Sequence, residues 1–499
     1  MPIAGMINSK LRNTIAIAGL LFTEFLVVVL ARDIYLNGLH MYTLGASSPE
    51  ITTPAKFIFP VRIILEVDSM NIFMALISST IALIAAIYSM ASMKKETGQD
   101  KFYFLTLLLV SGMLGMEMTG DIFNMFVFLE IASISGGALV AFRTRYADSP
   151  EGGLKYIVVS AIAGLMVLFA IGLLYSQYDL LNIAALANAI QYTTLDKIAL
   201  ALLAMAFLMK LGSVPMHMWL PDAYSVAPTA ITVILLANSQ ASMYALFRTC
   251  FSLFGLTMNV NTLGWMLIIL GVLSMFIGVT MAVLQRDIKR LIAYNCICES
   301  GFMLLGVGVG LAVLDNPTAL ATYGFQAMTG GIFHMVNHAL FEGLLFLAAG
   351  VIFHRIGTRN LNEMGGLGHG LKFTAVLFLL GAFASSGLPP LNGFASKILI
   401  YESVYHFNPV LAIIAVIVSI ITLAIFVKVF FSAFTGQMLP KFKEIKEAPK
   451  PMMISMTILS GIIILFGLFP GIVVDWLAHP AVNALINQAS YINAIIGGR

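Results

Sequence analysis

The stretch FLMKLGSVPMHMWLPD (Phe207–Asp222) places a lysine, a proline and a histidine inside an otherwise apolar segment. Lys210 falls within a predicted membrane span, where an ionised side chain costs about 2.5–3.5 kcal/mol on insertion scales. Pro215 removes a helical hydrogen bond, and a bilayer tolerates such a break only where protein or a wet cavity satisfies the freed backbone. A charge beside a helix break therefore predicts a functional site within the membrane.

The composition around this stretch is that of a membrane protein. The chain has 499 residues, of which 60% are hydrophobic and 10% charged, whereas a soluble domain carries about 25% charged residues. The net charge of +3 comes mostly from loops, so no nucleic-acid partner is expected. The three cysteines lack CxxC spacing, and no nucleotide, flavin or metal motif occurs, so we expect no cofactor and no metal.

Thirteen stretches are long enough to span a bilayer, which takes about 20 apolar residues. The first apolar stretch is too long for the h-region of a signal peptide, so it is interpreted as a span. No strand pattern occurs, and the prediction is an all-α polytopic membrane protein. The spans are expected at roughly 12–31, 69–92, 102–119, 121–142, 156–175, 197–220, 228–247, 262–284, 291–312, 322–352, 373–405, 409–434 and 452–470.

Basic residues orient these spans. Of the 27 lysines and arginines, eighteen fall in segments on the side of the N-terminus. Because short cytoplasmic segments carry the excess of positive charge, the N-terminus is predicted to lie in the cytoplasm, with the chain in the inner (cytoplasmic) membrane. Six basic residues fall on the other side (Arg32, Lys56, Arg62, Lys197, Arg248 and Arg499), and three fall within spans (Lys210, Lys397 and Lys428).

A second interrupted span reads SSGLPPLNGFASK (Ser385–Lys397) and ends in another lysine. The span count makes the two interrupted spans run in opposite directions. Paired Gly/Pro breaks of opposite direction are typical of inverted-repeat transporters. The predicted organisation is N-terminal spans with an outer loop (1–101), a first repeat half (102–261), a second half (262–435), and a C-terminal span with its tail (436–499).

Five motifs follow one another in a familiar order: GDIFNMFVFLEIAS, KLGSVPMHMWLPDAYSVAPT, QRDIKRLIAYNCICESG, FHMVNHALFEGLLFLAAG and GLPPLNGFASK. Over about Asn37–Pro470 the chain resembles the antiporter-like subunits of respiratory complex I, the D-type subunit of multisubunit sodium/proton antiporters, and their relatives in membrane-bound hydrogenases. The stretch NGLHMYTLG resembles the loop after the family's second helix, which implies that the family's first helix is missing. The resemblance implies one ion-translocating subunit of a larger complex.

The resemblance also assigns residues. Glu130 matches the family's intramembrane glutamate, Lys210 its partner lysine, and Lys397 the lysine of the second broken helix. His334 and His338 match the histidines between them. Three positions depart from the family: Gln240 and Glu342 stand where lysines are usual, and Glu299 stands where glutamine is common. We call the predicted proton path, formed by Glu130, Lys210, Gln240 with waters, His334, His338, Glu342 and Lys397, the buried line.

Charge pairing suggests how such a line could work. A Glu130–Lys210 pair at about 5 Å is worth about 3 kcal/mol at an effective dielectric near 20. Separating the pair would therefore make Lys210 give up its proton. Lys397 has no acid close to it in sequence.

Several residues allow a second interpretation. His334, His338 and Glu342 recur every four residues on one helical face, which suits either a proton relay or interhelical hydrogen bonds. His217 and Asp222 fit proton uptake or helix capping, and Glu299 fits a relay or a structural partner. For Asp287, Lys289 and Arg290, anchoring at the cytoplasmic surface is favoured.

Three functions remain open. The chain is either the proton- or sodium-moving subunit of a redox-driven complex, the D-type subunit of a stand-alone sodium/proton antiporter, or a non-conducting scaffold. The expected partners are other membrane subunits, a peripheral redox arm and the lipid bilayer. No bond chemistry is predicted for the chain itself.

Overall fold

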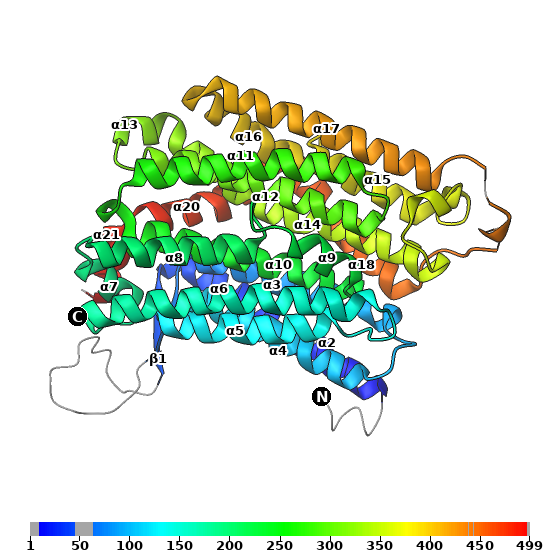
Figure 1. Cartoon of the computed structure of the whole chain (residues 1–499), viewed down its shortest axis with the longest axis horizontal. Coiled ribbons are helices and arrows are strands. Elements are labelled where there is room, and N and C mark those ends of the chain that lie inside the picture. The colour runs from blue at the N-terminus through cyan, green and yellow to red at the C-terminus, as the bar shows by residue number, and fades with distance from the viewer. Residues whose placement is uncertain (1–8, 45–62, 438, 443, 497–499) are drawn as a thin grey trace.

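The computed structural model describes residues 9–44, 63–437, 439–442 and 444–496. Lys56, Arg62, Lys443 and Arg499 of the charge count lie outside the described residues. The described chain forms a bundle of long helices that lie side by side along one axis (Figure 1). We call the end with the β-strands the hairpin end, and the opposite end, which carries Lys94, Arg143 and Arg355, the basic end.

Eleven helices of the described chain are long and apolar enough to cross a membrane, so the all-α polytopic prediction is confirmed. The two interrupted spans are each divided into two shorter helices, and none of these four helices is among the eleven. They are α8 (Thr194–Leu211) with α9 (Trp219–Val226), and α15 (Lys372–Ser386) with α16 (Asn392–Phe407). The count of thirteen spans therefore stays a prediction. The eleven are α2 (Ser9–Asn37), α3 (Ser69–Ser92), α4 (Gln99–Met118), α5 (Ile122–Val140), α6 (Asp148–Tyr178), α10 (Thr229–Phe247), α11 (Val260–Leu284), α12 (Ile288–Ala312), α14 (Phe325–Ile356), α17 (Pro409–Phe434) and α18 (Lys450–Leu468).

Short helical segments join these spans or cover the hairpin end. They are α7 (Ile183–Ala189), η1 (Arg248–Phe254), η2 (Gly255–Thr257), α13 (Pro317–Ala319), η3 (Leu320–Gly324), η4 (Leu361–Glu363), η5 (Leu367–His369), η6 (Pro440–Phe442), α19 (Pro470–Val473), η7 (Val474–Ala478), α20 (His479–Ile486) and α21 (Gln488–Ile496).

The two interrupted spans end their first helix in the same way. Helix α8 (Thr194–Leu211) stops at Gly212, and α15 (Lys372–Ser386) stops at Gly387, with φ of +78° and +77°. In each, the glycine and the residue after it donate backbone hydrogen bonds to carbonyls in the preceding turn, as in a Schellman-type cap. Glycine suits these positions because it adopts positive φ without strain.

After each break a second helix continues the span. It is α9 (Trp219–Val226) in the first case and α16 (Asn392–Phe407) in the second. The α8–α9 pair runs toward the basic end and α15–α16 toward the hairpin end (Figure 1). The predicted pair of broken helices with opposite directions is therefore present, and the boundaries of the two repeat halves stay a prediction.

Side chains satisfy the backbone that the breaks release. Ser274 Oγ accepts from the Val214 amide at 3.1 Å, and the Trp219 indole donates to the Met209 carbonyl at 2.9 Å. In the second break Lys397 Nζ donates to the Ser385 carbonyl at 2.7 Å. Protein groups therefore satisfy these three backbone groups, as the absence of water from a bilayer requires. The prolines of the breaks, Pro215, Pro389 and Pro390, are themselves exposed on the bundle surface.

Helices α10 and α12 are completely enclosed by other helices. Helix α11 packs closely on α12 because a stripe of glycines, spaced seven residues apart, faces it. A Cβ atom at Gly264, Gly271 or Gly278 would come within 2.4–2.8 Å of α12 backbone atoms. Small residues allow such close approach between membrane helices.

The prediction that strands are absent was wrong. Strands β1 (His40–Leu44) and β2 (Ile63–Val67) form an antiparallel ribbon at the hairpin end. Each strand has only five residues, too few for an alternating pattern to stand out among apolar spans.

Next to β2, buried polar groups join distant parts of the chain at the hairpin end. Arg248 pairs with Asp68 at 2.5 Å. Glu66 accepts from Tyr491 of α21 at 2.5 Å and from Asn182 at 2.8 Å. Burial raises the pKa of Glu66 to about 7, so its proton is held in the folded state at pH values where an unfolded chain would release it.

This raised pKa predicts how stability depends on pH. Because the folded state binds the Glu66 proton more tightly than the unfolded state, stability should fall as pH rises from about 4.5 to 7. The loss is at most about 3 kcal/mol at about 1.4 kcal/mol per pKa unit. The Glu66→Gln protein should lose less stability between pH 5 and pH 8 in thermal unfolding. Glu402→Gln, at an exposed position of α16, is the control, and equal pH dependence in Glu66→Gln and wild type would contradict the assignment.

Candidate functional site

The buried line draws its residues from five helices of the bundle. Glu130 lies on α5, Lys210 on α8, Gln240 on α10 and Lys397 on α16, while α14 supplies His334, His338 and Glu342. All of them except the half-buried Glu130 are buried. Glu299 of α12, predicted only as an accessory residue, lies among them.

Lys210 is held by hydroxyl groups. Its Nζ donates to Ser133 Oγ at 2.6 Å and to Ser160 Oγ at 3.1 Å, and it lies 5.6 Å from the centre of the Tyr156 ring. Tyr156 in turn accepts a hydrogen bond from Asn238 of α10 at 3.3 Å. Polar groups therefore lead from Lys210 to α10.

Glu130 lies against Gly164 of α6. A Cβ atom on Gly164 would come within 2.0 Å of Glu130 Oε1. That oxygen is buried and has no hydrogen-bond partner among the described residues. Glu130 and Lys210, both described, form no ion pair within 4.0 Å, so their direct pairing stays a prediction.

Gln240 and His338 meet at the centre of the line. Gln240 Nε2 donates to the Met335 carbonyl at 2.8 Å and lies 2.7 Å from His338 Nδ1. Because a carbonyl can only accept, the Gln240 group that faces Met335 is the amide nitrogen, and its second N–H points to His338 Nδ1. His338 Nδ1 is then an acceptor, and a neutral ring carries its proton on Nε2.

A small cavity of about 10 Å³ borders this pair. Gln240 Oε1 and His338 Nε2 have no hydrogen-bond partner among the described residues. A cavity of this size holds about one water. The polar residues that line it are Tyr224, Ser239, Gln240, Cys296, Ser300 and His338.

The second broken helix brings three titratable groups together. Glu299 bridges Lys397 Nζ at 2.9 Å and His334 Nε2 at 2.8 Å. His334 Nδ1 also lies 2.9 Å from Ser396 Oγ. No acid was noted close to Lys397 in sequence, and the structure places Glu299, 98 residues away along the chain, in direct contact with it.

Glu342 is linked to this triad through Ser385. Its carboxylate accepts from Asn295, from Ser385 Oγ at 3.3 Å, and from Cys296 Sγ at 3.6 Å. The Ser385 carbonyl accepts from Lys397. Cys296 also lines the central cavity, so Glu342 lies between the central pair and the Lys397 triad. Among the described residues no three His, Cys, Asp or Glu side chains are placed to hold a metal ion.

The other accessory residues lie apart from the line. Asp222 pairs with Lys155 at 2.7 Å and with Arg290 at 2.6 Å, which links α9 to α6 and α12. His217 lies in the first break, with Nδ1 3.3 Å from the Pro215 carbonyl. Lys289, expected at the membrane surface, is instead buried.

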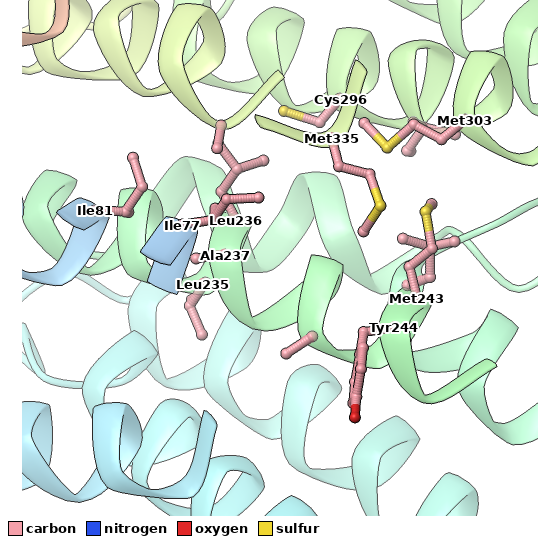
Figure 2. Close-up of a cluster of buried hydrophobic side chains, with 14 of the residues drawn as sticks. Ile77, Ile81, Leu235, Leu236, Ala237, Met243, Tyr244, Cys296, Met303 and Met335 are labelled. Carbon is pink, nitrogen blue, oxygen red and sulfur yellow. The ribbon is translucent and has the colours of Figure 1, made fainter. Parts of the chain in front are cut away.

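An apolar cluster surrounds the middle of α10. Figure 2 shows it, with Leu235, Leu236 and Ala237 beside Ile77 and Ile81 of α3, and with Met243 close to Met303 and Met335. These side chains are buried. The polar contacts of the line are therefore embedded in apolar packing, where an unpaired polar group is costly.

Sequence analysis missed the neutral partners, namely Ser133, Tyr156, Ser160, Asn238, Asn295 and Ser385. Single serines and asparagines are common in membrane helices, where they often bond to their own backbone. Their position within apolar spans was the only available indication of a role.

Comparison with known proteins shows the family and the fold of the chain. The profile of the family described as NADH:quinone oxidoreductase/Mrp antiporter, TM, matches residues 119–422. The D-type subunit of the Na(+)/H(+) antiporter of Alkalihalophilus pseudofirmus is 30% identical over 432 residues, covering 85% of this chain and 81% of the relative. The A-type subunit from the same organism is 30% identical over 441 residues, covering 84% of this chain. The chain spans about half of that longer relative, at 54% of its length.

A hydrogenase relative and two solved structures are also similar. Hydrogenase-4 component B of Escherichia coli is 28% identical over 86% of this chain and 65% of the relative. A chain of the Mrp complex from Dietzia sp. matches the fold with a TM-score of 0.87 at 23% identity, covering 99% of this chain and 97% of that chain. A chain of an archaeal membrane-bound sulfane sulfur reductase matches with a TM-score of 0.84 at 25% identity, covering 99% and 96%.

The Glu299 bridge predicts non-additive stability changes. Glu299→Leu leaves the Lys397 charge buried without a counter-charge, which should cost about 3–5 kcal/mol. Adding Lys397→Met removes that charge, so the double variant should unfold at a higher temperature than Glu299→Leu alone. Thermal unfolding of the purified proteins measures this. If the stability change of the double variant equals the sum of the changes in Glu299→Leu and Lys397→Met, the two residues do not interact energetically.

Proposed function

Because the chain belongs to the NADH:quinone oxidoreductase/Mrp antiporter family of membrane subunits, we propose that it translocates protons along the buried line as one subunit of a larger membrane complex. The observation that carries the proposal is a pair of buried lysines beside oppositely directed helix breaks, with polar groups between them. Ionisable residues within a membrane protein are expensive and mark ion paths.

The two lysines have different environments. Among the described residues, the partners of Lys210 Nζ are two hydroxyl groups and an aromatic ring, so the more distant Glu130 is the acid that would balance its charge. Lys397 already shares Glu299 with His334. At an effective dielectric near 20, two unit charges 4 Å apart interact by about 4 kcal/mol. Movement of Glu130 toward or away from Lys210 would therefore change whether Lys210 keeps its proton.

The change would pass along the line by electrostatics and proton transfer. Gln240 cannot titrate. A water in the adjacent cavity would join His338 to Cys296, which donates to Glu342. Ser385 then links Glu342 to Lys397. No step forms or breaks a bond other than those to the proton, so redox chemistry would belong to other members of the complex.

We place the N-terminus and the basic end at the cytoplasmic face of the inner membrane, because basic residues gather there. Within a complex the chain would contact other membrane subunits and lipid. The favoured assembly is redox-driven, of the complex I or membrane-bound hydrogenase type, with a peripheral redox arm. The match to the D-type relative over most of both chains supports a second candidate, a stand-alone sodium/proton antiporter. Sodium is a candidate second ion in either assembly.

The first test is proton movement in membrane vesicles that hold the assembled complex, followed with a pH-sensitive dye. Lys210→Ala and Lys397→Ala should each lower the rate at least about tenfold, because each removes a proton-carrying group. Lys428→Ala, at an exposed lysine of α17, should leave the rate unchanged. Normal rates in both test variants, with the complex intact, would make the chain a scaffold.

The driving force separates the two assemblies. Proton movement under an imposed sodium gradient, with no electron donor, would identify a stand-alone antiporter. Movement only after addition of an electron donor would identify a redox-driven complex.

A second prediction tests Glu130 without changing a titratable group. Gly164→Ala should displace the Glu130 carboxylate, since the new methyl group would come within 2.0 Å of Oε1. We expect a severalfold lower rate of proton movement with normal assembly. Gly172→Ala, on the same helix with open space around the glycine, is the control. An unchanged rate in Gly164→Ala would argue against a role for the position of Glu130.

A further inference from the structure

A polar cavity of about 320 Å³ opens at the basic end of the bundle. Residues from the α5–α6 connection, the starts of α6 and α12, and the α14–α15 connection contribute its charges. The charged side chains that line it are Arg143, Asp148, Asp287, Lys289 and Arg359. No residue of the buried line borders this cavity, and the mechanism above makes no use of it.

Lys289 differs from the other charged residues of the cavity. Arg359 pairs with Asp148 at 2.8 Å and with Asp287 at 3.0 Å, and Arg143 pairs with Glu96 at 3.0 Å. Lys289 is only 3% exposed, and among the described residues no carboxylate lies within 4.0 Å of its Nζ. An ionised group buried without a counter-charge is costly, so this position suits a side chain that changes its protonation state.

The contacts of Lys289 point from the cavity toward the centre of the bundle. Its Nζ donates to the Ala227 carbonyl at 2.7 Å and to Thr232 Oγ1 at 3.2 Å. Thr232 donates to the Tyr224 carbonyl at 3.0 Å, and the Tyr224 hydroxyl lies 2.7 Å from Ser239 Oγ. Tyr224 and Ser239 both line the small cavity beside Gln240 and His338. Two gaps interrupt these contacts: the distance from the Tyr224 carbonyl to its own hydroxyl, and the small cavity between Ser239 and the Gln240–His338 pair. Lys289 or a water would have to move across the first gap, and a water in the cavity would bridge the second.

Three methionines lie in the opposite direction. Met243 of α10, Met303 of α12 and Met335 of α14 all lie on the hairpin-end side of the Gln240–His338 pair along their helices. They are buried in the apolar cluster (Figure 2). Hydroxyl groups therefore lie between the central pair and Lys289 at the basic end, whereas these three apolar side chains lie on the hairpin-end side.

We propose that Lys289 is the proton-loading residue of this chain, through which the Gln240–His338 pair exchanges protons with the cavity at the basic end. The proposal rests on the proton translocation proposed above and adds the route of uptake. The alternative is structural, with Lys289 serving only as a donor to the carbonyl that ends α9.

Lys289→Arg separates the two roles. Arginine keeps the positive charge and the N–H donors but cannot release its proton. In vesicles holding the complex, we expect Lys289→Arg and Lys289→Gln to lower proton movement at least about tenfold. A wild-type rate in assembled Lys289→Arg would overturn the proposal, because the structural role would then be sufficient. If Lys289→Arg fails to assemble, Lys289→Gln takes its place, because glutamine keeps a donor for the Ala227 carbonyl. A wild-type rate in assembled Lys289→Gln would then overturn the proposal.

A pH profile gives a readout that a structural role would not move. Lys289→His replaces the loading group by one that titrates near pH 6.5, while Arg143, Asp148, Asp287 and Arg359 around it stay the same. The alkaline limit of proton movement should shift to lower pH in this variant. An alkaline limit equal to that of the wild type would overturn the proposal.

The control variants keep this test separate from that of the proposed function. Lys428→Gln replaces a lysine that also donates to a backbone carbonyl, at 3.4 Å, but is exposed, and its rate should be unchanged. If Lys210→Ala abolishes proton movement while Lys289→Arg does not, only the uptake route is wrong. If Lys210→Ala and Lys397→Ala both move protons normally, the proposed function itself fails.

Discussion

The absence of water in the bilayer core is the constraint on which the rest of this structure depends. A membrane helix satisfies its own backbone, and an interrupted helix needs other groups to do so. Here Ser274, the Trp219 indole and Lys397 supply the hydrogen bonds at the two breaks. The backbone groups that the breaks release therefore bond to other helices of the bundle, and the breaks hold buried lysines among polar neighbours.

The two halves meet that constraint with different chemistry. In the first half, two hydroxyl groups accept from Lys210, and a Glu130 oxygen with no hydrogen-bond partner in the described part of the chain lies against a glycine. In the second half, Glu299 is in direct contact with Lys397 and His334. A charge that is held loosely responds more readily to a neighbouring change than one held in a tight pair. This difference favours Lys210 as the switched group and the Lys397 triad as the more stable end of the line.

Sequence reasoning reached the repeat architecture because its indicators are local. The prolines and glycines of the breaks, the lysines beside them and the asymmetry of basic loops can each be read within one span. The partners of those lysines could not be read in this way. Glu299 lies 98 residues from Lys397 along the chain, and hydropathy carries no information on which faces of two helices meet. The short hairpin was missed because its strands are brief and each adjoins an apolar span, α2 in one case and α3 in the other.

The sequence by itself determined that the chain is a membrane bundle with two oppositely broken helices, because apolar length, proline position and charge are properties of single segments. Only the tertiary structure decided which buried groups touch. It placed Glu299 between Lys397 and His334 and paired Gln240 with His338. It also left Lys289 Nζ with no carboxylate of the described residues within 4.0 Å. Contacts of this kind depend on how helices rotate and pack, and packing is set by the side chains of all neighbouring helices together.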